Sequence, residues 1–285
     1  AFDIVKEHGE EVFPEPSSEA ETKPSPTSAK NESIQVTKQE RSPMAVPPKV
    51  SVVINEEQLR DYLGPPIYHK DRMYTNTMPA GVALGLGYLG NGSGSLMPIE
   101  TTLMPGKGNL HLTGKLGDVI KESASIALSW VKSHAYELGL TKEPGDTLLD
   151  HRDVHLHMPE GAIGKEGPSA GVAFAVSLIS LLTDRSLPTK LAMTGEVSLR
   201  GMVLPVGGLK EKLLAAHRAG ITTVILPAHN RPSVEADVPK SVLDDLEVHY
   251  VTNVWAALDV AFGHGPWSAQ ARVWSSNETP EAASQ

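Results

Sequence analysis

Ser169 combines a nucleophilic side chain with the start of a helix. It stands in the run Gly-Pro-Ser-Ala-Gly at 167–171, between a polar loop and an almost unbroken apolar helical pattern. The first N–H groups of a helix lack partners within the helix and lie at the positive end of its dipole. A serine there could attack a carbonyl whose developing oxyanion those groups stabilise. The alternative is that Ser169 only caps the helix.

Lys212 could serve as the base for such a serine, in a helical pattern from Leu209 to Arg218. The residues about one turn from it are small or apolar, namely Gly208, Leu209, Ala215 and Ala216. This predicts that Lys212 faces the core while Lys210 and Glu211 face water. Burial lowers the pKa of an amine, and a neutral lysine can take a serine proton. The alternative is that Lys212 extends along the surface and keeps its charge in water.

The Gly-x-Ser-x-Gly spacing also occurs in the nucleophile elbow of α/β-hydrolases, where a strand ends directly before the serine. Here the preceding strand pattern ends at Met158, well before Ser169. A Ser-His-Asp hydrolase or esterase is therefore an alternative. Its other members would come from Asp244, Asp259, His249 and His264.

His155 and His157 alternate along a strand pattern and so point to one face. Such a pair can bind zinc, but no motif supplies a third ligand. We expect them to pack or hydrogen-bond near the Ser169 loop, with no metal centre. Thr194 precedes Gly195 at a strand end, where its hydroxyl could orient the lysine amine. The sequence has no P-loop motif.

The patterns around these residues predict fold class α+β, as one compact domain of mixed sheets and helices from about residue 49 to 263. Strands are expected at 49–54, 81–88, 95–103, 111–114, 153–158, 190–199, 201–206, 222–227 and 247–251. Helices are expected at 55–63, 116–138, from the Ser169 loop to about 183–185, and at 209–218, 242–246 and 254–262. Asn91-Gly92 predicts a hairpin, and 190–199 is expected to pair with 201–206.

Composition narrows the class of protein. The chain has 285 residues, 40% of them apolar, no cysteine and a formal net charge of -9. There are thus no disulfides or cysteine-bound metals, and a general nucleic-acid binder is disfavoured. No apolar run is long enough to span a bilayer. The start, without Met or a signal peptide, reads as a cut from a longer chain. We expect 9–48 to be a disordered linker and 264–285 a flexible tail.

Three motifs in order resemble the proteolytic domain of the Lon ATP-dependent proteases. They are Pro-Glu-Gly-Ala through Gly-Pro-Ser-Ala-Gly (159–171), Ala-Met-Thr-Gly-Glu-Val-Ser-Leu-Arg-Gly (192–201) and Leu-Pro-Val-Gly-Gly-Leu-Lys-Glu-Lys (204–212). The similarity extends from about Val52 to Phe262. It implies a serine endopeptidase domain with a dyad of Ser169 as nucleophile and Lys212 as base, acting through an acyl-enzyme. The oxyanion would be held by backbone N–H groups around Ser169 and Ala170.

The resemblance also implies supporting residues. Thr194 would hydrogen-bond the lysine amine, and Glu100 matches a family glutamate near the active site. His155 and His157 match the family's His-x-His strand, which supports the site and binds no metal. Glu166 stands where the family usually has Asp, so the fine geometry and self-inhibition of that loop do not carry over.

For the whole protein, the resemblance implies a homo-hexamer with an ATPase unfoldase before the protease, of which 1–8 would be the end. ATP and Mg²⁺ would bind there, with no cofactor in the chain itself. Unfolded or damaged proteins would be the substrates, with no membrane or nucleic-acid partner. Residues 9–48, 63–68 and 127–130 look most like peroxisomal eukaryotic members, so we expect the peroxisomal matrix, with the mitochondrial matrix as the alternative. A further alternative function is a non-catalytic module that holds a ring together.

Overall fold

The computed structural model describes residues 55, 74, 76–89, 92–159, 165–263 and 267. Contacts divide the chain into the units Ala1–Ile67 and Tyr68–Gln285, and the helices and strands described below belong to the second. Several expectations fall outside the described residues. These are the segments 1–8 and 9–48, the strand 49–54, all but Asn55 of the helix 55–63, and all but Trp267 of the tail 264–285.

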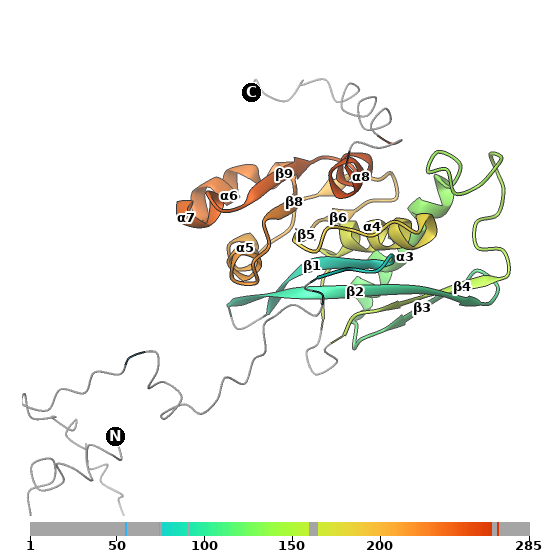
Figure 1. Cartoon of the computed structure of the whole chain (residues 1–285), viewed down its shortest axis with the longest axis horizontal. Coiled ribbons are helices and arrows are strands. Elements are labelled where there is room, and N and C mark those ends of the chain that lie inside the picture. Colours follow the sequence, from blue (N-terminus) through green and yellow to red (C-terminus); the bar gives the residue numbers. More distant parts are fainter. Residues whose placement is uncertain are drawn as a thin grey trace, which may run out of the picture. The chain divides into compact units, whose positions relative to one another are not determined.

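A seven-stranded mixed sheet lies at the centre of the described domain (Figure 1). Its strands are β1 (Val82–Leu89), β2 (Ser93–Pro105), β3 (Leu110–Thr113), β4 (Arg152–His157), β5 (Leu191–Met193), β8 (Thr223–Pro227) and β9 (Glu247–Val251), in the spatial order β3-β4-β2-β1-β5-β8-β9. β2 pairs antiparallel with β1 and β4, whereas the other neighbours are parallel. This mixture of strand directions confirms the α+β expectation.

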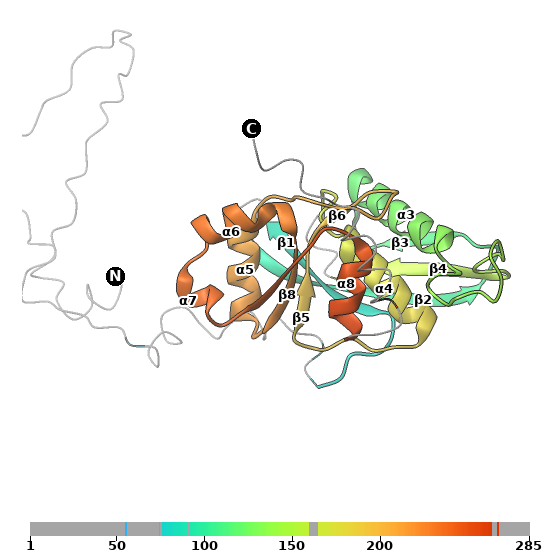
Figure 2. The ribbon, with the colours of Figure 1, turned by 90° about the horizontal axis from the view of Figure 1, so that it is seen from above.

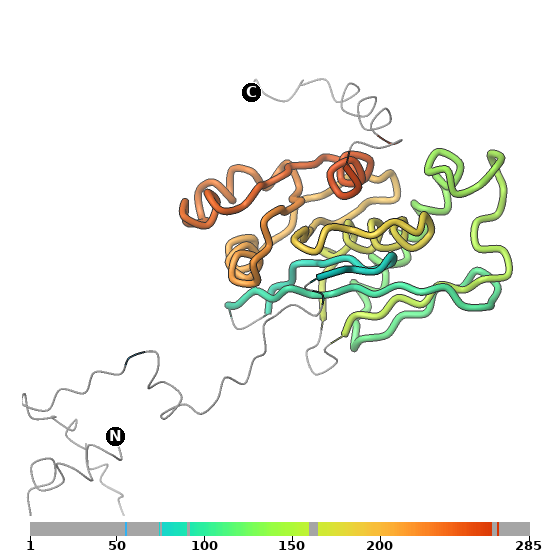
Figure 3. Tube along the Cα trace, in the orientation of Figure 1, coloured from blue at the N-terminus to red at the C-terminus, as the bar shows by residue number. Residues whose placement is uncertain are grey.

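Helices pack on and beside this sheet. They are α3 (Asp118–Ser133), α4 (Gly171–Thr183), α5 (Leu209–Arg218), α6 (Arg231–Asp237), α7 (Lys240–Leu243) and α8 (Val254–Phe262). α4 packs against β1 and β2, and α3 and α8 flank it (Figure 2). α5, α6 and α7 gather at one end of the domain, and the connection 134–151 extends from the other (Figure 3). In the described part, no helix has both the length and the apolar character needed to cross a membrane.

α4 is the central helix because it is apolar on all sides. Every residue from Gly171 to Ser180 is buried. Its two buried serines both hydrogen-bond to Gly81, in the turn that precedes β1. Ser177 Oγ donates to the carbonyl of Gly81 at 2.9 Å, and the Gly81 N–H donates to Ser180 Oγ at 2.9 Å. The start of β1 is thereby tied to the helix that begins beside Ser169.

The expected strand 190–199 is wrong as a single element. β5 ends at Met193, and Glu196–Val197 (β6) pairs instead with Val203–Leu204 (β7) in a separate two-stranded sheet. Between them the chain leaves the large sheet, because the N–H of Gly195 donates to the carbonyl of Ser169 at 2.8 Å. The expected pairing of 190–199 with 201–206 is therefore confirmed only for Glu196–Val197 with Val203–Leu204. The break after β5 brings Thr194 to the Ser169 loop.

Three helices differ from the expectation. α3 ends at Ser133, well before the predicted end at 138, and α7 starts and ends slightly earlier than predicted. α6 was not expected. Pro232 lies in its first turn, where a missing N–H costs nothing, but a proline in a polar run reads as a loop. The hairpin, β3, β4, α5, β8, β9 and α8 are confirmed.

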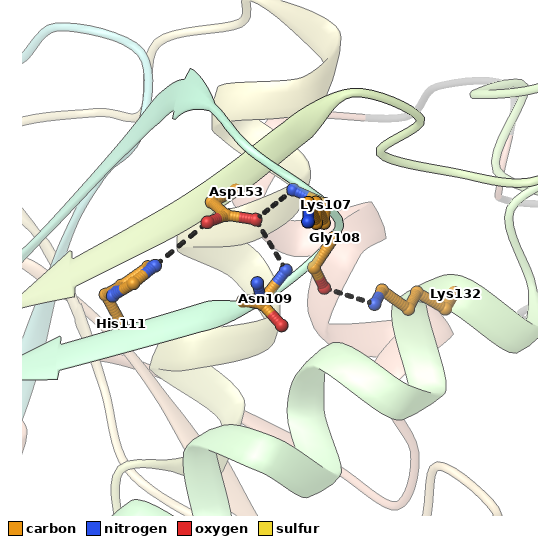
Figure 4. Close-up of polar contacts among 6 residues, drawn as sticks. All are labelled: Lys107, Gly108, Asn109, His111, Lys132 and Asp153. Carbon is orange, nitrogen blue, oxygen red and sulfur yellow. Dashed lines mark hydrogen bonds and ion pairs between the residues drawn. The ribbon is translucent and has the colours of Figure 1, made fainter.

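Asp153 of β4 closes the turn between β2 and β3 (Figure 4). Its carboxylate accepts the N–H groups of Lys107 at 2.6 Å and Asn109 at 2.7 Å, and its other oxygen lies 3.0 Å from His111 Nε2. These hydrogen bonds hold the pKa of Asp153 well below its usual range, and the one with His111 has the largest effect. The turn therefore depends on a charged acceptor.

Asp153→Asn keeps the shape of the side chain and removes its charge, so we expect the Tm at pH 7 to fall by several degrees. Because the pKa of Asp153 is lower in the folded than in the unfolded protein, its carboxylate stabilises the fold at pH values above the unfolded pKa of about 3.9. This stabilisation is lost as the pH falls through the folded pKa. The Tm difference from wild type, followed by circular dichroism, should therefore shrink in acid. Asp150→Asn, at an exposed aspartate, is the control. Equal Tm values for the two variants at pH 7 would contradict the prediction.

Candidate active site

One cleft of about 940 Å³ contains both Ser169 and Lys212. The strand residues Gly85–Leu89 and Met97 line it together with the segments 165–170 and 205–208. Ile120, Met158 and Glu211 also contribute. We call this the Ser169 cleft. Ser169 and Lys212, which are far apart in the sequence, therefore both line one cleft.

Ser169 lies in the turn directly before α4. The N-cap residue of α4 is Ala170, and no side chain caps the helix, so the capping role considered for Ser169 is wrong. Within the described residues, Ser169 Oγ makes no hydrogen bond, and the N–H groups of Ser169 and Ala170 donate none. A hydroxyl and two amides at the positive end of a buried helix are thus uncommitted beside the cleft.

Lys212 is only 2% exposed, which confirms the expected orientation toward the core and excludes the surface alternative. α5 begins after Gly208, whose φ of +68° suits glycine and lets the chain turn sharply into the helix. Burial lowers the pKa of Lys212 to about 8. Among the described residues no acid pairs with it, so the amine is readily neutral near physiological pH.

Thr194 connects the lysine to the serine loop. Lys212 Nζ donates to Thr194 Oγ1 at 3.1 Å, and Thr194 Oγ1 donates to the carbonyl of Ser169 at 3.1 Å. A hydroxyl has one proton, and Thr194 gives it to that carbonyl. It cannot also donate to a neutral lysine, so the lone pair of Lys212 stays available in the cleft. No hydrogen bond joins Ser169 Oγ to Lys212 Nζ within the described residues, as is common before substrate binds.

The loop before Ser169 is tied to the segment ahead of α3. Lys165 is 3% exposed, and its Nζ donates to the carbonyl of Gly114 at 3.2 Å. The Gly117 N–H donates to the Lys165 carbonyl at 2.9 Å. The exposed Glu166 carboxylate lies against Gly117, where a side-chain carbon would overlap it. Both residues line the Ser169 cleft, and the polar loop pattern did not indicate that Lys165 is buried.

Glu100, His155 and His157 lie together, but not in the Ser169 cleft. They line a separate pocket of about 270 Å³, in which Tyr74 donates to Glu100 Oε1 at 2.5 Å. Thr113 Oγ1 lies 2.9 Å from His155 Nε2 and 2.7 Å from His157 Nδ1. The structure therefore groups these residues with one another and not with Ser169. In the described ranges, no group of three His, Cys, Asp or Glu residues is placed to hold a metal ion.

The acids and bases considered for a Ser-His-Asp arrangement also lie elsewhere. His249 and Asp259 line a third pocket of about 350 Å³, and His249 Nε2 lies 3.1 Å from Glu247 Oε1. Asp244 ends α7, and His264 is outside the described residues. None of the described candidates shares the cleft with Ser169.

Known proteins match nearly the whole described domain. Residues 53–264 match the family described as Lon protease (S16) C-terminal proteolytic domain. The chain is 43% identical over 261 residues to "Lon protease homolog 2, peroxisomal" of Xenopus laevis, covering 91% of this chain and 30% of that protein. It is 47% identical over 214 residues to the protein of that name from Oryza sativa subsp. indica, with coverages of 75% and 24%. For Mus musculus the identity is 44% over 238 residues, with coverages of 83% and 27%.

The chain thus spans less than a third of the length of these curated relatives. The family match, in contrast, extends over most of the chain and includes β1, α4 and α5 as well as Ser169, Thr194 and Lys212. The chain therefore belongs to the Lon protease (S16) C-terminal proteolytic domain family.

Proposed function

We propose that this chain is a serine endopeptidase domain in which Ser169 is the nucleophile and Lys212 is the general base. The observation that carries the proposal is the bridge through Thr194. One buried hydroxyl accepts from the Lys212 amine and donates to the main chain of Ser169, and Ser169 and Lys212 both line one cleft. The membership of the Lon proteolytic family supports the same reaction class.

In the first half of the reaction, neutral Lys212 takes the proton from Ser169 Oγ. The oxygen attacks the peptide carbonyl carbon, and a C–O bond forms. The N–H groups of Ser169 and Ala170 then stabilise the negative charge on the carbonyl oxygen. When the tetrahedral intermediate collapses, the C–N bond breaks and the leaving amine takes the proton from Lys212. An acyl-enzyme on Ser169 remains.

In the second half, Lys212 is neutral again and takes a proton from water. The resulting hydroxide attacks the acyl carbon, and the C–O bond to Ser169 breaks. Lys212 returns its proton to Ser169 Oγ, which restores the starting state. The amine cycles between two protonation states, and burial places its pKa close enough to neutrality for both to be populated.

The activity of the whole protein is also part of this proposal. We infer that the chain acts in a homo-hexamer whose ATPase module, N-terminal to the protease domain, binds ATP and Mg²⁺ and delivers unfolded or damaged proteins. The relatives from Xenopus laevis and Oryza sativa subsp. indica are named as peroxisomal, which favours the peroxisomal matrix as the location of this protein. A module that only assembles a ring is the competing function. Labelling of Ser169 by a serine-directed phosphonate would reject that alternative.

Hydrolysis of a short unstructured peptide should become faster as the pH rises, because the base must lose its proton. We expect kcat/KM to level off above an apparent pKa of about 8. Ser169→Ala and Lys212→Ala should each lower kcat by roughly 100-fold or more. Lys210→Ala, on the exposed side of the same helix, is the control and should behave as wild type.

Two results would overturn the assignment of the base. One is wild-type activity with an unchanged pH profile in Lys212→Ala. The other is a loss of activity in His249→Ala as large as that in Ser169→Ala, which would favour the Ser-His-Asp alternative.

Thr194→Val removes the bridging hydroxyl and keeps the side-chain shape. We expect kcat to fall by roughly 10- to 100-fold, because both the amine and the serine loop lose their common anchor. The apparent pKa should move to lower pH, since the protonated amine loses an acceptor. Thr194→Ser keeps the hydroxyl and should retain most of the activity. Equal kcat and pH profiles in wild type and Thr194→Val would show that the bridge has no role.

A further inference from the structure

We infer that Ser123, on α3, is a positioning residue that aims the amide of Ser169 at the oxyanion. This inference rests on the proposed dyad and adds a residue to which the resemblance assigned no role. Ser123 does not line the Ser169 cleft, so it would act through the main chain and not by touching the substrate.

The side chain of Ser123 reaches from one helix to the loop of another. It is 3% exposed, and its Oγ donates to the carbonyl of Pro168 at 3.1 Å. The same carbonyl accepts the N–H of Gly171 at 3.2 Å. A side-chain carbon at Gly171 would lie only 3.2 Å from Ser123 Oγ, so the missing side chain allows this close approach of α3.

Ser123 differs in this respect from other serines on its helix. Ser125 Oγ donates to the carbonyl of Lys121 at 3.0 Å, and Ser129 Oγ donates to that of Ser125 at 2.8 Å. These are the usual bonds of a helical serine to the carbonyl one turn earlier. Ser123 instead gives its proton to a residue far away in the sequence. Its hydroxyl therefore stabilises the serine loop and not its own helix.

Holding the Pro168 carbonyl also orients the N–H of Ser169, because both belong to one planar trans peptide unit and point in opposite directions. The next unit is held in the same way. The Ser169 carbonyl accepts from Thr194 Oγ1 and from the Gly195 N–H, which orients the N–H of Ala170. Two hydroxyls, one from α3 and one from the β5–β6 connection, thus bind the carbonyls of the two peptide units whose N–H groups are the proposed oxyanion donors.

This support matters because catalysis depends on donors that are already aligned when charge develops. Gly167, with φ of +89°, precedes the first of these units and gives the chain unusual freedom there. Without Ser123, the Gly171 N–H would be the one remaining donor to the Pro168 carbonyl among the described residues. A small rotation of the peptide would then misalign the Ser169 amide and slow the reaction.

The test is the steady-state hydrolysis of a short peptide by Ser123→Ala in the full chain. We expect kcat to fall by about 10- to 100-fold with KM within about twofold of wild type, since the amide acts mainly in the transition state. The apparent pKa should stay at the wild-type value, because the Lys212–Thr194 bond is untouched. The affinity for a peptide boronate, whose tetrahedral adduct occupies the oxyanion position, should fall in parallel with kcat/KM.

Ser177→Ala is the matched control. It also removes a buried hydroxyl that holds a main-chain carbonyl, but at Gly81, outside the cleft. We expect it to lower the Tm and to leave kcat unchanged. Ser123→Cys keeps a weak donor of similar size and should retain more kcat than Ser123→Ala. If Ser123→Ala does not fold, as judged by circular dichroism, Ser123→Cys decides by the same criteria.

The inference is overturned if Ser123→Ala has the kcat of wild type, or if its boronate affinity is unchanged while kcat falls. A kcat loss in Ser177→Ala equal to that in Ser123→Ala would also overturn it, because the effect would then be one of stability. Failure of the dyad looks different, since Ser169→Ala or Lys212→Ala would then remain active. Full activity of Ser123→Ala beside inactive Ser169→Ala would reject only the role of Ser123.

Discussion

The burial of one unpaired amine is the constraint on which the candidate site depends. Lys212 is enclosed by α5 and the strands packed against it, and no carboxylate of the described residues pairs with it. The lowering of its pKa from 10.5 to about 8 corresponds to roughly 3 kcal/mol in favour of the neutral form. A neighbouring acid would reverse this shift and keep the lysine charged. Under the proposed function, this burial supplies a base near neutral pH at a cost in stability.

Main-chain carbonyls organise the rest of the site. The loop at Ser169 has its carbonyls turned toward α3 and toward the β5–β6 connection, and each is held by two donors. Among the described residues, the N–H groups on the opposite side of these peptide units have no hydrogen-bond partner. This arrangement requires the chain to leave the large sheet after Met193, since a continuous strand would have used the Gly195 N–H in the sheet. The small β6–β7 sheet is therefore linked to the candidate site through the position where β5 ends.

Local patterns predicted most of the framework and part of the site. The hairpin β1–β2, the central α4 and the amphipathic α5 follow from periodicity and turn residues, and α5 correctly placed Lys212 inside. The roles of Ser123 and Lys165 were not predicted, because a serine on a helix and a lysine in a polar loop are ordinary locally. Their partners, Pro168 and Gly114, are distant in the sequence. Glu100 and the His-x-His pair were expected near Ser169, but they line a separate pocket. Alternation along a strand predicts which face of the sheet a side chain is on, but it does not predict how far that face lies from a loop.

The sequence by itself determined the α+β class, the order of the main elements, the inward direction of Lys212 and, through three motifs in order, the Lon proteolytic family. These depend on side-chain periodicity and on short-range spacing, which the linear chain carries directly. Only the tertiary structure decided that Ser169 does not cap its helix, that Thr194 joins the lysine to the serine loop, and that Ser123 reaches the same loop from α3. Those relations are hydrogen bonds between residues far apart in the chain. They exist because packing of α3, α4 and α5 around the sheet brings the groups within about 3 Å, the range of such bonds.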